Sequence, residues 1–239
     1  MNTEHSYNLI RDPLYYVTLI FFVIVTTVPA AILSQSLFMP VSQAVSLVIF
    51  TALAVRRGDM RQALIIVGVW LALQFILLAA LTWLLPTRLD HAFANGFNLR
   101  TATLQGFYTG QNLPRTLGVA PLSGLVEVAG VTLGSLATGG LIGAFFLVRA
   151  VNFAAFGMGG LLAAKIGNLA ALPLWTLIKL AGYAGFFVLL SRPVLTGNFS
   201  PSAIVGPNRR LLIISAALLV VGLLLELVLP GLWSGWFAP

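Results

Sequence analysis

Three charged side chains lie inside long apolar runs of the chain: Glu127, Lys179 and Glu226. An isolated lysine at membrane depth costs roughly 3 kcal/mol on insertion scales, so Lys179 should face the interior and have an acidic partner. One interpretation makes the three residues a proton or ion site. The other, which we favour, makes them a buried ion pair that holds helices together. We expect Glu127 to be the partner, because Glu226 lies closer to the interface.

Two further polar residues, Arg149 and Asn152, lie at the junction of two expected helices, Leu122–Val148 and Val151–Ala164. We therefore expect them to anchor the chain at the membrane interface and to cap a helix end. Together with the three charges above, they complete the set of intramembrane polar candidates.

The search for a catalytic or metal-binding motif finds none in this sequence. It contains no HExxH, GxSxG or GxxxxGK[ST] pattern and no cysteine, and both histidines, His5 and His91, lie outside the apolar runs. Hydrolytic chemistry inside the membrane would lack its nucleophile and base. We expect no catalytic residue, no metal site and no cofactor, and so we expect a protein that is not an enzyme.

The composition excludes a soluble globular domain. Hydrophobic residues make up 59% of the chain and charged residues 8%, with a mean hydropathy of +1.00, whereas charged residues are about 25% of soluble domains. The net charge of +7 reflects only six acids, and the basic residues are scattered instead of clustered as nucleic-acid binding would require. The expected partners are the lipid bilayer and other membrane subunits or further copies of this chain.

The apolar runs predict an all-α, polytopic transmembrane bundle of about seven spans. If the short segment Val151–Ala164 is re-entrant, the number is six. The expected spans are Leu14–Leu33, Val41–Val55, Ala63–Leu85, Leu122–Val148, Val151–Ala164, Leu169–Leu190 and Leu211–Leu229.

A single integral membrane domain, 1–239, should contain all of these spans. Its expected parts are an N-terminal tail (1–13), a three-helix half (14–85), an extramembrane lid segment (86–120), a glycine-rich helical half (121–229) and an aromatic tail (230–239). Recurring apolar residues in the lid segment indicate a surface-lying helix or an ordered loop.

Glycines are concentrated in the stretch Pro121–Gly167, which we expect to be the packing hub of the bundle. Glycines four residues apart share one helix face and let another helix approach closely. The expected helix-packing residues are Gly130, Gly134, Gly139 and Gly143.

The placement of arginine and lysine predicts the orientation of the seven-span bundle. With a cytoplasmic N-terminus, eight basic residues lie inside and four outside, as the positive-inside rule requires. The inner residues are Arg11, Arg56, Arg57, Arg61, Arg149, Arg192, Arg209 and Arg210, and the outer ones are Arg88, Arg100, Arg115 and Lys165. We expect a multi-pass protein of the cell (inner) membrane.

The second half of the chain resembles the stage II sporulation protein M family of bacterial membrane proteins. The resemblance covers about Gly118–Trp233: a small-residue helix (VAGVTLGSLATGGLIGAFF), the turn RAVNFAAFGMGG, a span with AGYAG and a last helix ending LLELVLPG. Asn152, Glu226 and Pro230 match the turn asparagine, the closing acid and the closing proline. Phe153 replaces the turn glycine, and the His-Gly that opens the penultimate span of the family is absent.

The resemblance implies a non-enzymatic protein that works inside a larger membrane assembly, sometimes one linked to transport. Our first functional hypothesis is therefore a structural or interaction subunit. The alternative is a small-solute or ion permease or channel, or a transporter membrane subunit, with Glu127, Lys179 and Glu226 along the path.

Overall fold

The computed structural model describes residues 12–57, 60–110, 120–200 and 208–237, and these residues form helices and no strand. The all-α bundle that the composition predicts is therefore confirmed. In chain order the helices are α1 (Pro13–Ile32), α2 (Phe38–Arg56), α3 (Met60–Leu84), α4 (Pro86–Ala92), α5 (Gly96–Thr109), α6 (Ala120–Thr138), α7 (Leu141–Ala163), α8 (Asn168–Ala171), α9 (Leu174–Thr196) and α11 (Arg209–Phe237).

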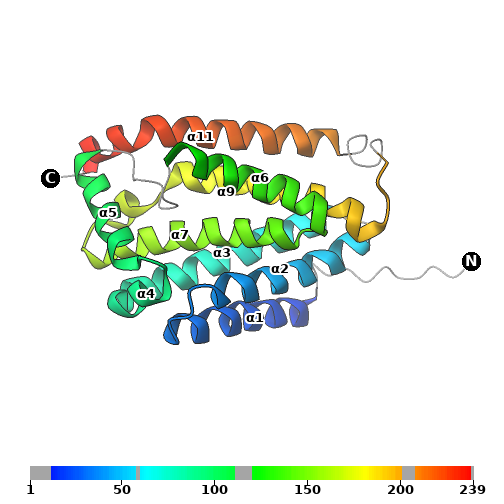
Figure 1. Ribbon diagram of the computed structural model, residues 1–239, viewed down its shortest axis with the longest axis horizontal. Helices are drawn as coiled ribbons and strands as arrows, with labels where there is room; N and C mark the ends of the chain where they lie inside the picture. Colours follow the sequence, from blue (N-terminus) through cyan, green and yellow to red (C-terminus); the bar gives the residue numbers. More distant parts are fainter. Residues whose placement is uncertain (1–11, 58–59, 111–119, 201–207, 238–239) are drawn as a thin grey trace, which may run out of the picture.

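The long helices lie side by side along the long axis of the molecule (Figure 1). Helix α1 forms one edge of the bundle and α11 the opposite edge. Helix α7 lies in the middle, where it contacts α2, α3, α6 and α9, and α11 packs mainly on α9. The part of the expected packing hub that forms α7 is thus central to the bundle.

Among the described residues, six helices are long and apolar enough to cross a membrane: α1, α2, α3, α7, α9 and α11. This is the architecture of a multi-pass membrane protein. The segment Val151–Ala164 is not a separate short helix, because nearly all of it belongs to the 23-residue α7. The short helix in this half of the chain is α6. Its apolar part over the fully described residues, Gly124–Thr138, falls in the range of 10–17 residues. A membrane crossing needs ~20 residues.

A turn at Gly139 and Gly140 separates α6 from α7. Their φ angles are 64° and 103°, a region that glycine adopts readily and other residues avoid. The backbone N–H of Ile142 donates to Oγ1 of Thr138 at 3.0 Å, which satisfies one free donor at the start of α7. The predicted single helix Leu122–Val148 is therefore wrong, since the chain reverses direction within it.

The described part of the predicted lid segment, 86–110, forms two short helices, α4 and α5, at one end of the bundle (Figure 1). Pro86 begins α4, where its missing N–H costs no hydrogen bond. Asn95 joins the two helices in a left-handed conformation, with φ of 58°. Residues 111–119, including Arg115, lie outside the described residues.

The two ends of the chain differ from the predicted boundaries. Of the expected tail, residues 1–11 lie outside the described part. Asp12 caps α1 by accepting a hydrogen bond from the N–H of Leu14 at 2.9 Å. At the other end, α11 continues through Pro230 to Phe237, so the described part of the expected aromatic tail is helical. Trp233 holds this part against α8 by donating from Nε1 to the carbonyl of Ala170 at 2.8 Å.

Candidate functional site

Lys179 on α9 contacts two acids on two neighbouring helices. Its Nζ donates to both carboxylate oxygens of Glu226 on α11, at 3.0 and 3.2 Å, and lies 3.9 Å from Glu127 on α6. The Lys179 side chain is 7% exposed. We call these three residues the ion cluster. The expectation that Glu127 is the closer partner is wrong, because Glu226 makes the hydrogen bonds.

Glycine in α11 brings Glu226 to the lysine. A Cβ added to Gly222 would lie 2.7 Å from the backbone nitrogen of Lys179, so only glycine lets the two helices come this close. Gly222 and Glu226 are four residues apart and share the face of α11 that packs on α9. Gly182 repeats the arrangement from the α9 side, because its Cβ would lie 2.8 Å from the nitrogen of Leu219. The sequence analysis identified neither glycine as a helix-packing residue.

Lys179 lies closer to one end of its helix than expected. Pro173 precedes α9, which begins at Leu174, so the predicted span Leu169–Leu190 is divided between α8 and α9. Lys179 is five residues from the start of α9, or about 7.5 Å along the axis, and not near the middle of a span.

Four neutral polar side chains form a closed hydrogen-bonded ring in the core of the bundle. We call them the amide cluster. Nε2 of Gln43 donates to Oγ1 of Thr27 (3.1 Å), which donates to Oε1 of Gln74 (2.8 Å). Nε2 of Gln74 donates to Oδ1 of Asn152 (3.0 Å), whose Nδ2 donates back to Oε1 of Gln43 (2.7 Å).

The amide cluster is as buried as the apolar core around it. Thr27, Gln43 and Gln74 are 0% exposed and Asn152 is 2% exposed. Each carbonyl oxygen accepts one hydrogen bond and each amide nitrogen donates one, so the burial leaves none of these atoms without a partner. The sequence analysis singled out only Asn152, and for a different role: it lies within α7 and caps no helix end.

Arg149 is also inside α7, as the ninth of its 23 residues, and not at a helix junction. Its guanidinium lies 5.3 Å from the centre of the Phe153 ring, one turn further along the helix. In the described part of the chain it forms neither an ion pair nor a hydrogen bond. Arg149 and Asn152 both line a pocket of about 200 Å³.

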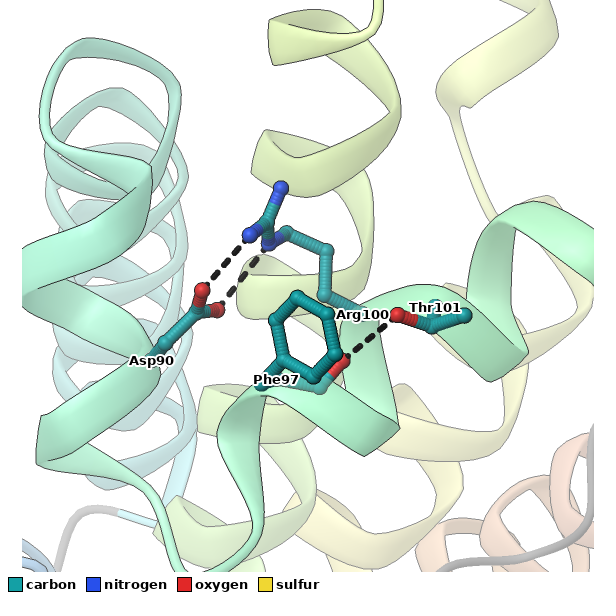
Figure 2. Close-up of polar contacts among 4 residues, drawn as sticks. All are labelled: Asp90, Phe97, Arg100 and Thr101. Atoms are coloured by element: carbon teal, nitrogen blue, oxygen red, sulfur yellow. Dashed lines mark hydrogen bonds and ion pairs between the residues drawn. The ribbon is translucent and has the colours of Figure 1, made fainter.

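An ion pair between Asp90 on α4 and Arg100 on α5 holds the two short helices together (Figure 2). Arg100 donates from Nε and Nη2 to the two carboxylate oxygens, at 3.0 and 2.6 Å. The hydrogen bonds that Arg100 donates to Asp90 raise the pKa of Arg100 above its ordinary value. Such two-point pairing fixes geometry as well as charge, so α4 and α5 form one packed unit.

The glycines singled out in the sequence pack the α6–α7 hairpin. A Cβ on Gly134 would lie 2.5 Å from Cγ2 of Ile142, and one on Gly143 would lie 2.9 Å from the carbonyl of Val131. Gly130 faces the ring of Phe146 in the same hairpin. Gly139 belongs to the turn and contributes to no helix face. These glycines therefore serve contacts within the chain.

Comparisons with models of known protein families, with curated proteins and with solved structures found no match to this chain. Among the described residues, no three histidine or acidic side chains lie close enough to hold a metal ion. The helices that could span a membrane define the class of protein: an all-α, multi-pass membrane bundle.

Proposed function

We propose that this chain is a non-enzymatic structural or interaction subunit of a larger membrane assembly. One observation carries the proposal. The amide cluster takes one residue from each of α1, α2, α3 and α7, and the ion cluster takes one from each of α6, α9 and α11. Every long helix is thus tied once into one of two buried polar clusters, an arrangement that favours a rigid bundle over helices that move past one another.

The outer face of α11 is the surface we propose for contact with other subunits. In its most apolar window of 18 residues, 17% are buried, against 33–56% in the other five candidate spans. Large apolar side chains point away from the bundle along its length, including Val220, Leu224 and Leu227. The resemblance to the sporulation protein family, which works within assemblies, supports the same role.

The mass of the particle in mild detergent tests the proposal. Cross-linking in the membrane before extraction should yield species larger than the 25.5 kDa of one chain. Leu224→Trp should reduce them without lowering thermal stability. Ile76→Trp, at an exposed site of α3, is the matched control and should leave them unchanged. A particle of one chain alone, with or without cross-linking, would contradict the assembly role.

A small-solute permease is the second candidate, and the pocket beside Arg149 favours it. The residues first considered for a path, Glu127, Lys179 and Glu226, are instead engaged with one another. A permease would therefore depend on Arg149, and a flux that survives Arg149→Gln would argue against a path through this pocket.

We also propose that the protein lies in the cell (inner) membrane with its N-terminal end cytoplasmic. The C-terminal ends of α2 and α9 and the N-terminal ends of α3 and α11 lie at that end, and α4, α5 and α8 lie at the other (Figure 1). Within the described ranges, six basic side chains belong to the first end and three to the second, which supports this orientation. The six are Arg56, Arg57, Arg61, Arg192, Arg209 and Arg210, and the three are Arg88, Arg100 and Lys165.

Cysteine labelling in intact cells tests the orientation. The natural chain has no cysteine, so it gives no background. Gly167→Cys has open space for its side chain and should react with an impermeant thiol reagent. Asn198→Cys, at the other end, should react only after the cells are opened. The reverse pattern would invert the proposed topology.

A further inference from the structure

Arg149 differs from the three charged side chains of the ion cluster. Glu127, Lys179 and Glu226 contact one another, whereas Arg149 forms neither an ion pair nor a hydrogen bond in the described residues. Arginine stays protonated in proteins, and a charge without a partner at membrane depth is costly. An anion bound next to the guanidinium would compensate this charge.

The pocket beside Arg149 combines this charge with apolar walls. It lies between the α1–α2 turn, the α4–α5 connection and α7. Leu37 and Ala94 at its rim are exposed, Leu37 by 68%. Phe93, Phe145 and Phe153 supply aromatic surface. A mostly apolar lining with a few polar groups is typical of ligand sites, and about 200 Å³ accommodates a headgroup-sized fragment rather than a large solute.

We propose that this pocket binds a phosphate or carboxylate group attached to an apolar body. The guanidinium offers donors in the planar fork that oxyanions accept at two points, and the ring of Phe153 restrains its orientation. Asn152 lines the same pocket, and its amide uses one N–H for Gln43, so the second N–H is available to the ligand. The inference does not depend on the assembly role.

Isothermal titration calorimetry of the purified protein with hexyl phosphate, in an uncharged detergent, tests the site. We expect saturable binding, and weaker binding of inorganic phosphate, which lacks the apolar part. Losing a charged hydrogen-bond donor should weaken binding of hexyl phosphate by about 10–100-fold in Arg149→Gln, and less in Arg149→Lys, which keeps a point charge. Arg88→Gln, at an exposed arginine of α4, is the control and should bind as the natural protein does.

A second variant tests the site without removing the charge of Arg149. Ala94→Trp places a large ring at the exposed rim and should block binding while the bundle stays folded. The ligand could be a membrane lipid or a soluble amphiphile, and native mass spectrometry of the protein in phosphatidylglycerol nanodiscs distinguishes the two. If the natural protein retains lipid and Arg149→Gln loses it, the ligand is a membrane lipid. If the protein binds hexyl phosphate but retains no lipid, the ligand is a soluble amphiphile. If neither ligand binds, or if Arg149→Gln and Ala94→Trp bind both as tightly as Arg88→Gln, the proposal is wrong.

Discussion

Lys179→Met is expected to destabilise the bundle by about 3–5 kcal/mol, the range found when one member of a buried ion pair is removed. The reason lies in what the change leaves behind. Two carboxylates, of Glu127 and Glu226, remain close together with 20% and 17% of their side chains exposed, and they lose the cation that compensated them. An ion pair on an exposed surface contributes less than about 1 kcal/mol to the free energy of unfolding.

The unfolding free energy of the purified protein, measured by steric trapping in lipid micelles, checks this value. Lys165→Met is the matched control, because Lys165 is the other lysine of the chain and is exposed. It should change the free energy of unfolding by no more than about 0.5 kcal/mol. Equal effects of the two substitutions would show that Lys179 has no special role in stability.

Asn152→Leu should have the second large effect. Leucine has a similar size but offers no hydrogen bond, so Nε2 of Gln74 and Oε1 of Gln43 both lose their partner in the amide cluster. Each buried unpaired group costs about 1–3 kcal/mol. The combined loss should therefore exceed that of an ordinary core substitution, and thermal unfolding in detergent would detect it as a clear fall in Tm.

Thr51→Val provides the control for the amide cluster. Thr51 is also 0% exposed, but its hydroxyl only donates to the carbonyl of Leu47 within the same helix, at 2.7 Å. That carbonyl keeps its helical partner when the hydroxyl is gone, so the loss should be small. A Tm for Asn152→Leu no lower than for Thr51→Val would contradict the proposed role of the cluster.

The helical class of the protein could be predicted from sequence, but the boundary between α6 and α7 could not. Long apolar runs predict spans because a membrane requires internal hydrogen bonding of every backbone group. The error came from two ambiguous signals. Gly139 and Gly140 occur in a glycine-rich run that also suits helix packing, and Arg149 with Asn152 look like a polar turn. Only the packing of α7 against four helices decides that the polar pair lies within the helix and the glycine pair outside it.

The polar interior could be predicted in part. Charges at membrane depth need partners, so the ion cluster could be anticipated, but the choice between Glu127 and Glu226 depends on the close approach of α11 at Gly222. The amide cluster gave a weaker signal, because Gln43 and Gln74 are neutral and sit in different spans. Amides within apolar runs bond across helices, which could have singled them out, though not their closure into one ring.

The helix-holding role of the ion cluster is the central claim, and a double variant tests it most directly. Replacing Lys179 by Met and Glu226 by Gln together removes the cation and the acid bonded to it, and neutral substitutes often match a buried ion pair in stability. Lys179→Met/Glu226→Gln should therefore recover at least half of the free energy of unfolding lost in Lys179→Met. If the double variant recovers none of it, or if Lys179→Met proves fully stable yet abolishes a measurable ion or solute flux, the cluster does not hold the bundle together.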